Sequence, residues 1–364
     1  MNVKSARTSP DLRTAREIRL VARSQGSPTT ADFRIAEVCL PEPAPGQVLV
    51  RNHWFAARAV MRALMGEEEL PMPRYQPGAA LWGPAVGRVV RRGDADGPAP
   101  GTWVLHGLGW RDLALVETGQ FRQIAPADLD VDAGSDVDAS ADAPRQDAHV
   151  RDRLLAHLAQ GETAYTGLMG AACLRPGDTV FISGAAGSVG SMAGQIARLK
   201  GAGRVIGSAG SPAKVAWLLD ELGYDAAFDH HERPVLDQLR RAAPEGIDVY
   251  FDNVGGEQLR AALRSARPGA RFALCGVLGQ QSDRELPGVE LDTFDVIAKR
   301  VRLQGFTAHD HPDLLPRYEE ELAQWLAEGR LVIPAVRYRG LDEAPEALLA
   351  LLGGRHTGNV VVEL

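Results

Sequence analysis

The stretch TVFISGAAGSVGSMAGQIARLKG, residues 179–201, decides the fold class of this chain. An apolar strand pattern runs into Gly184, Gly187 and Gly190, and an amphipathic helix pattern follows directly. Glycines allow a tight turn and let a pyrophosphate approach the backbone, while the helix N-terminus offers unpaired N–H groups. A GxxGxxG pattern alone is weak, but the strand–turn–helix context predicts a dinucleotide-binding turn. The alternative is a glycine-rich connection that holds no ligand.

Around this stretch, residues 154–330 alternate apolar strands with helices of about ten residues, which is typical of βαβ units and a parallel sheet. Residues 16–124 instead carry short strands separated by Gly and Pro, and the tail from 331 returns to strand patterns around one helix. We therefore predict an α/β protein in which a Rossmann domain, residues 154–330, is inserted into a β-barrel domain formed by residues 1–153 and 331–364. An aspartate-rich segment, residues 126–150, is expected to be a solvated acidic loop.

Composition excludes several classes of protein. The 364 residues carry a net charge of −7, so no basic surface indicates nucleic acid as a partner. No apolar run approaches the length of a membrane span. Cys39, Cys173 and Cys275 stand alone, which gives neither a disulfide framework nor a metal-binding cysteine pair. The first twenty residues lack the apolar core of a secretory signal, so we expect a cytoplasmic protein.

The second strand of the α/β region predicts which cofactor binds. In an NAD site an acidic residue near the end of this strand bonds the ribose 2′-hydroxyl. RVIGSAGSPAK, residues 204–214, has no acid and offers Ser208, Ser211 and Lys214 instead. Hydroxyls and a cation suit a 2′-phosphate, so NADPH is favoured over NADH. The alternative for Lys214 is a lysine that simply faces solvent.

From about residue 16 onward the chain resembles the zinc-independent medium-chain dehydrogenase/reductases, in the branch of NADPH-dependent alkenal/enone reductases. The resemblance rests on the glycine-rich stretch together with GETAYTGL (161–168), GIDVYFDNVGG (246–256), CGVLG (275–279), KRVRLQGF (299–306) and the tail APEALLALLGGRHTGNVVVEL (344–364). It implies a GroES-like catalytic domain beside a Rossmann domain, with NADPH in the cleft between them. It also implies hydride transfer to the β-carbon of an α,β-unsaturated ketone or aldehyde, with no metal.

The resemblance also implies which residues contact the cofactor. These are Gly184, Gly187, Ser188, Val189, Gly190, Ser211, Lys214, His230, Asn253, Cys275, Gly276, Val277, Phe306, Thr307, His356 and Asn359. His230 stands where many relatives have a tyrosine. In the tail, relatives often read GxNxGK, so His356 takes the place of the asparagine and Asn359 that of the lysine.

The residues expected to line the substrate site differ more from the family motifs than the cofactor residues do. Relatives carry DPYMR after the third strand, whereas this chain reads RAVMR over residues 58–62, so a base, Arg58, replaces the acid. Arg58 is a candidate for an anionic substrate group, or else a surface arginine. Tyr165 is the first candidate for a catalytic polar group, or else a packing residue. His53, Tyr75 and His106 are weaker candidates of the same kind.

Four functions remain open from sequence. An NADPH-dependent enone reductase is favoured, followed by a quinone oxidoreductase and by a biosynthetic enzyme with altered, even redox-neutral, chemistry on the same fold. A non-catalytic NADPH-binding protein is the fourth. Relatives usually form homodimers by joining the edges of their Rossmann sheets, and VRLQGF, residues 301–306, is a plausible edge strand. We expect a homodimer that acts on a small molecule.

Overall fold

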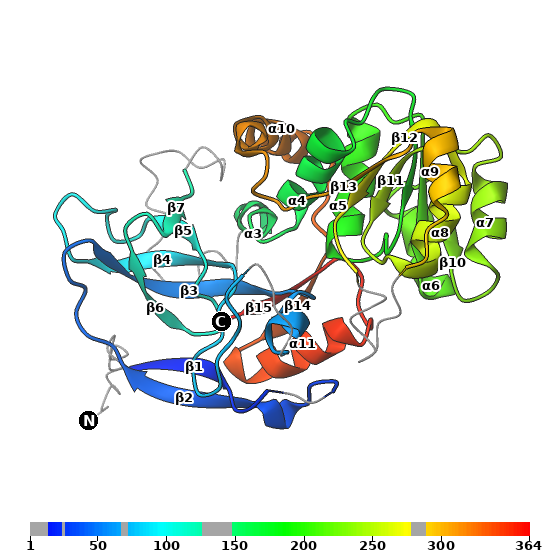
Figure 1. Cartoon of the computed structure of the whole chain (residues 1–364). Helices are drawn as coiled ribbons and strands as arrows, with labels where there is room; N and C mark the ends of the chain where they lie inside the picture. Colours follow the sequence, from blue (N-terminus) through cyan, green and yellow to red (C-terminus); the bar gives the residue numbers. More distant parts are fainter. Residues whose placement is uncertain (1–13, 24–25, 67–71, 126–147, 278–288) are drawn as a thin grey trace, which may run out of the picture.

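The computed structural model describes residues 14–23, 26–66, 72–125, 148–277 and 289–364. The chain forms two lobes, one built around a parallel sheet and the other around a mostly antiparallel barrel sheet (Figure 1). The acidic segment predicted at residues 126–150 falls almost entirely outside the described ranges. No helix in those ranges combines the length and the apolar character that spanning a membrane requires.

The first lobe is a doubly wound α/β domain. Its six strands are all parallel and lie in the order β10-β9-β8-β11-β12-β13. Their bounds are β8 Thr179–Ile182, β9 Arg204–Ala209, β10 Ala226–Asp229, β11 Ile247–Asp252, β12 Ala266–Leu274 and β13 Arg302–Gly305. The helices are α3 Ala148–Ala156, α4 Gly161–Tyr165, α5 Ser188–Leu199, α6 Pro212–Asp220, α7 Val235–Ala242, α8 Gly256–Arg264, α9 Thr293–Lys299 and α10 Leu315–Ala327. A π-helical turn, Thr166–Ala171, follows α4.

Alternating side chains of the central strands give this sheet a core on each face. Val180 and Ile182 of β8 pack with α4, α5 and α10, whereas Phe181 between them packs with α7 and α8. The sheet is therefore buried on both faces, as a parallel sheet requires. The prediction of a parallel, doubly wound sheet is confirmed.

The second lobe is built from both ends of the described chain. Its main sheet has the order β14-β15-β3-β4-β5-β7, with β6 also paired to β3, and a separate hairpin joins β1 to β2. The strands are β1 Thr14–Leu20, β2 Phe33–Cys39, β3 Gln47–Ala57, β4 Ala85–Arg92, β5 Trp103–His106, β6 Leu113–Glu117, β7 Phe121–Gln123, β14 Ala335–Arg339 and β15 Asn359–Glu363. Its helices are α1 Met61–Leu64 and α11 Ala344–Leu352, with short 3₁₀ turns at Thr30–Asp32 and Leu341–Glu343. A third 3₁₀ turn, Pro312–Leu314, directly precedes α10 of the α/β lobe.

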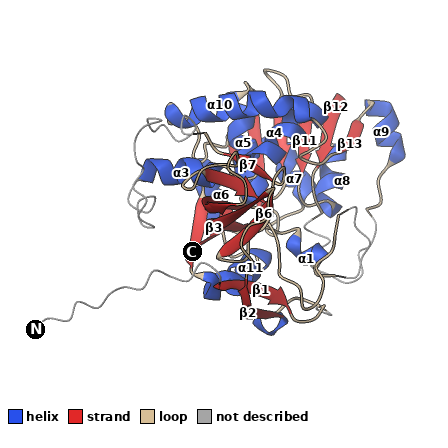
Figure 2. Ribbon diagram, turned by 90° about the vertical axis from the view of Figure 1, so that its left-hand side faces the viewer, coloured by secondary structure: helices blue, strands red, loops and turns tan. Residues whose placement is uncertain are grey.

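The last strand, β15, ties the two ends of the chain together. It lies between β14 and β3, parallel to the first and antiparallel to the second. Viewed from the side, the barrel strands lie between α11 and the helices of the α/β lobe (Figure 2). The segment that enters β15 thereby reaches the carboxyl end of the parallel sheet, where α/β proteins bind their ligands.

Candidate active site

The glycine-rich turn joins β8 to α5 in a conformation that only small residues permit. Gly184 has φ +57°, in the left-handed region that favours glycine. A Cβ on Gly190 would lie 2.5 Å from the carbonyl oxygen of Gly184 and 2.6 Å from the Cα of Ala185. Glycine at position 190 therefore lets the first turn of α5 pack directly against the strand end.

The start of α5 has the donors that a pyrophosphate needs. The helix begins at Ser188, and its N-cap, Gly187, has no side chain that could bond the first amide groups. A Cβ on Gly187 would approach only the carbonyl of Gly184, at 3.3 Å, so this side of the turn is open. The first N–H groups of a helix have no partner within the helix, and together with its dipole they attract an anion. These residues fit a dinucleotide phosphate.

The tail of the barrel lobe closes onto this turn. The Gly358 N–H donates to the carbonyl of Ala186 at 2.9 Å, and the Ser188 hydroxyl donates to Oδ1 of Asn359. The Asn359 amide in turn donates to the carbonyl of Pro334 at 3.1 Å. The structure thus brings together two predicted residues, Ser188 and Asn359, from segments 171 positions apart.

A second group of predicted residues gathers where α6 begins. The Ser211 hydroxyl caps α6 by accepting the N–H of Lys214 at 3.3 Å. Lys214 Nζ donates to the carbonyl of Gly354 at 2.6 Å, which brings the lysine to the tail segment that carries His356. Burial lowers the pKa of Lys214. The pKa of His356 is lowered by burial and then by the positive charges of Arg355 and Lys214. Basic groups thus converge here.

His230 lies at the carboxyl end of β10, against the loop that leads to Ser211. Its Nδ1 lies 2.7 Å from the carbonyl oxygen of Ala209, and its Cε1 would lie 3.4 Å from a Cβ on Gly210. The centre of the ring lies 4.0 Å from that of His231, with the two planes tilted by 39°. Asp229 completes a group of possible metal ligands whose atoms lie within 4.8 Å of one another. His230 thus lies near the loop between β9 and α6.

The ends of β11 and β12 are held by a buried hydrogen-bond network. The Asn253 amide and backbone N–H donate to the carbonyl and hydroxyl oxygens of Ser183, each at 2.8 Å. The carboxylate of Asp252 accepts the Ser183 hydroxyl at 2.9 Å. The N–H groups of Cys275 and Gly276 both donate to the Asp252 carbonyl. Burial raises the pKa of the Cys275 thiol to about 12, so it stays protonated.

Two residues of this network, Ser183 and Asp252, were not predicted. Both are polar residues at the end of an otherwise apolar strand, TVFI for Ser183 and IDVYF for Asp252. Polar residues at carboxyl strand ends are the signal that would have identified them.

The remaining predicted cofactor residues lie along the same sheet edge. Val277 is exposed beyond the end of β12, and Thr307 is exposed beyond β13, where its hydroxyl bonds Asp310 at 2.7 Å. Phe306 is buried and packs edge-on against Phe251 in the core. Val189 lies in the first turn of α5 and packs partly against the core.

The predicted catalytic role of Tyr165 is at odds with its position. The ring is 1% exposed and packs against Tyr318 of α10, and the hydroxyl donates to Glu321 at 3.0 Å. Glu321 also accepts Lys200 Nζ at 2.8 Å, and Lys200 caps the C-terminal end of α5. The glycine turn is at the other end of this helix, roughly 18 Å away. This position favours the alternative stated for Tyr165, a packing residue.

The weaker candidates lie in the barrel lobe and are largely occupied by internal contacts. The Tyr75 hydroxyl donates to the carbonyl of Trp82 at 2.6 Å. His106 bonds Asn52 at 2.8 Å, and burial lowers its pKa to about 4, so it is neutral near pH 7. His53 is buried with its ring 4.8 Å from that of Trp103.

Arg58 follows β3 at the junction of the two lobes. Its Nη2 donates to the carbonyl of Leu158 at 3.1 Å, so the side chain points toward the segment between α3 and α4. Burial lowers the pKa of Arg58 to about 10, an effect that Glu162 partly offsets. The guanidinium remains charged at neutral pH.

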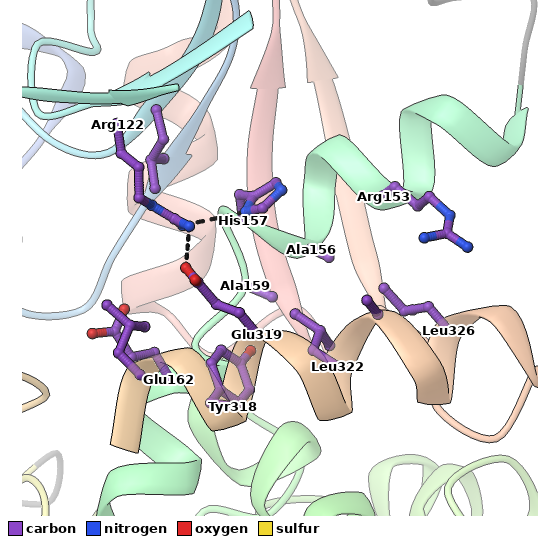
Figure 3. A pocket seen from close by; sticks show the side chains of 13 residues that line it. Arg122, Arg153, Ala156, His157, Ala159, Glu162, Tyr318, Glu319, Leu322 and Leu326 are labelled. Carbon is purple, nitrogen blue, oxygen red and sulfur yellow. Dashed lines mark hydrogen bonds and ion pairs between the residues drawn. The ribbon is translucent and has the colours of Figure 1, made fainter. Parts of the chain in front are cut away.

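A separate cavity of about 60 Å³ lies between α3, α4, α10 and the strands β5 and β7 (Figure 3). Arg122 reaches across it to Glu319 and lies 3.4 Å from Nδ1 of His157. None of the residues of the glycine turn lines it. It belongs to the packing between the lobes rather than to the dinucleotide site.

Comparisons with known proteins agree with this geometry. The chain matches the family model "Zinc-binding dehydrogenase" over residues 188–328 and the model "N-terminal domain of oxidoreductase" over residues 16–124. The two models cover the two lobes of a medium-chain dehydrogenase/reductase.

Individual relatives identify the branch of this class to which the chain belongs. The chain is 33% identical to the NADPH-dependent curcumin reductase of Escherichia coli over 95% of each chain. It is 32% identical to the NADP(+)-dependent 2-alkenal reductase of Nicotiana tabacum over 93% of this chain and 94% of the relative. The crystal structure of CurA from Vibrio vulnificus superposes with a TM-score of 0.82 at 31% identity, covering 96% of this chain and 98% of that one. This chain belongs to the NADPH-dependent alkenal/enone reductase branch of the medium-chain dehydrogenase/reductases, which confirms the predicted family.

Proposed function

We propose that this enzyme uses NADPH to reduce the carbon–carbon double bond of α,β-unsaturated ketones and aldehydes. The proposal rests on the start of α5, where no side chain caps the first amide groups and where Gly358 and Asn359 of the tail contact the turn. The chain also matches a 2-alkenal reductase over nearly its whole length. The CurA structure from Vibrio vulnificus has also been solved in complex with NADPH.

We assign separate groups of residues to the pyrophosphate and to the 2′-phosphate of NADPH. The amides at the start of α5, from Ser188 to Gly190, bind the pyrophosphate. Ser211, Lys214 and His356 bind the 2′-phosphate, because the three lie together where α6 meets the tail. His230 borders the adenosine.

The nicotinamide and the substrate would bind at the other end of the site. Bound NADPH would supply the hydride that adds to the β-carbon of the substrate, and the α-carbon then takes a proton to give the saturated carbonyl compound. The loops after β11 and β12, with Asn253, Cys275, Gly276 and Val277, border the nicotinamide half, and Phe306 and Thr307 continue this border beyond β13. The buried hydrogen bonds of Asp252 and Ser183 hold these loops in place, which would fix the residues that border the nicotinamide half.

The oligomer and the compartment are part of the same proposal. β13 ends the parallel sheet, and on the neighbouring α9 Phe294 and Ile297 are 74% and 73% exposed. Pairing of two β13 edges would bring apolar surface of both copies together, so we propose a homodimer. Light scattering at micromolar concentration tests it, and a monomer contradicts it. Three free cysteines suit the reducing cytoplasm.

The test of the reaction is NADPH oxidation, followed by absorbance, against a panel of enones, enals and quinones. We expect turnover with an enone or enal and recovery of the saturated carbonyl compound. Turnover confined to quinones would assign a quinone oxidoreductase instead. Tight NADPH binding with no turnover across the panel would contradict the proposal and favour either a biosynthetic enzyme with altered chemistry or a non-catalytic binding protein.

A further inference from the structure

Arg58 is a positively charged residue at the junction of the two lobes, and its guanidinium makes fewer hydrogen bonds than it can. In the described part of the chain, its Nε is buried without a hydrogen-bond partner, and its one bond is from Nη2 to the carbonyl of Leu158. No carboxylate among the described residues lies within ion-pair distance of it, since Glu162 acts on it only through space. A buried positive charge is costly unless an anion compensates it.

The strand register places Arg58 beside the phosphate-binding turn. β3 and β15 run antiparallel with Ala57 opposite Val360 and Ala56 opposite Val361. Continued by one residue, this register sets Arg58 opposite Asn359, and opposite residues of an antiparallel pair point to the same face. Asn359 accepts the hydroxyl of Ser188, the first residue of α5.

The burial of the neighbouring residues identifies that face. Ala56 and Val361 pack in one cluster with Leu154 and Leu158, whereas Ala57 and Val360 pack in another cluster with α11. Alternation along the strand therefore puts Arg58 and Asn359 on the side of Ala56. The bond from Arg58 to Leu158 agrees with this side.

These two facing positions carry a single charge, the positive charge of Arg58. Position 58 is an arginine, and the position opposite it is the neutral Asn359. The amide of Asn359 is occupied by Ser188 and by the carbonyl of Pro334. The tail therefore presents no cation at position 359 for an anion on the turn.

We propose that Arg58 supplies, from β3, the cation that neutralises the pyrophosphate of NADPH at the start of α5. This rests on the proposed use of NADPH. An arginine suits the role because its planar donors match two phosphate oxygens at once. The alternative ligand, a substrate carboxylate, is disfavoured because the position opposite Arg58 is bonded to the phosphate turn itself.

The experiment compares nucleotides with and without the pyrophosphate. Binding of NADPH, of 2′-phospho-ADP-ribose and of adenosine 2′-monophosphate is measured by calorimetry on the full chain and on Arg58→Met. We expect the variant to weaken the first two equally, by about 10- to 100-fold, the size of a lost bond to a charged group, and to leave the third unchanged. Arg58→Lys, which keeps the charge, should lose clearly less.

A charge exchange supplies the sharper test. Arg58→Asp alone should abolish detectable binding of 2′-phospho-ADP-ribose, and adding Asn359→Lys should restore it to within about tenfold of wild type. Arg62→Met is the matched control, because Arg62 lies four residues on and bonds the carbonyl of Gly26. We expect wild-type affinity from it.

The possible failures are distinguishable. Unchanged affinity of Arg58→Met for both diphosphate nucleotides would overturn the assignment, and a raised KM for a carboxylate-bearing enone would then assign Arg58 to substrate. Failure of the wild-type chain to bind NADPH would instead contradict the proposed function.

Discussion

The hydroxyl of Ser188, at the start of α5, donates to the side-chain amide oxygen of Asn359, at the start of β15. This contact joins the phosphate turn of one lobe to a central strand of the other, and the bond from the Gly358 N–H to the Ala186 carbonyl reinforces it. The turn and the barrel sheet are thereby coupled, so the residues that we propose to bind the cofactor also hold the two lobes together.

Asn359→Asp should weaken NADPH binding by about tenfold or more, because it places a negative charge beside the pyrophosphate and removes the donor to Pro334. Fluorescence titration with NADPH measures the effect. Asn359→Ala is the control without charge. It loses both side-chain hydrogen bonds, whereas aspartate still accepts from Ser188, and it should cost about 1–3 kcal/mol of unfolding free energy, with a smaller loss of affinity. Equal affinities for the two variants would contradict a pyrophosphate at this position.

Two glycines of the turn should respond differently to alanine. Gly190→Ala places its Cβ against the backbone of Gly184 and Ala185, so we expect a loss of about 1–3 kcal/mol in unfolding free energy. Gly187→Ala meets only one atom, at 3.3 Å, and should leave Tm nearly unchanged while weakening NADPH. Thermal unfolding with and without NADPH separates the two effects. A stable Gly190→Ala variant with normal affinity would refute the packing argument.

Lys214→Ala should weaken NADPH by roughly 10- to 100-fold and NADH hardly at all, since only NADPH carries the 2′-phosphate. In the structure Lys214 Nζ bonds the carbonyl of Gly354, so the lysine exchanges this partner for the phosphate on binding. Dissociation constants for both cofactors provide the measurement. Equal losses for the two would remove Lys214 from the 2′-phosphate site.

Tyr165→Phe should lower stability and leave catalysis intact. The lost hydroxyl bond to Glu321 is expected to cost about 1–2 kcal/mol, while kcat should stay within roughly twofold of wild type because the hydroxyl lies near the far end of α5. Denaturant unfolding and steady-state kinetics measure the two quantities. A large fall in kcat with unchanged stability would return Tyr165 to the active site.

The sequence was most informative where structure is local. The turn from Gly184 to Gly190 depends on neighbouring residues, and it lies between β8 and α5, where the strand–turn–helix pattern predicts it. The orientation of Tyr165 depends instead on α10, some 150 residues further along, and no local pattern encodes that contact. The link from Ser188 to Asn359 depends on how the two lobes close, which is equally non-local.

The central place of β15 has a consequence for how the protein is made. β3 needs β15 as a partner on one side, yet residues 58–358 separate the two strands. At a ribosomal speed of about 5–20 residues per second, β3 waits on the order of 15 to 60 seconds for that partner. During translation the α/β lobe can fold first, while the half-finished barrel exposes an open strand edge. Premature release of the nascent chain before residue 359 would leave that edge unpaired, a template for aggregation.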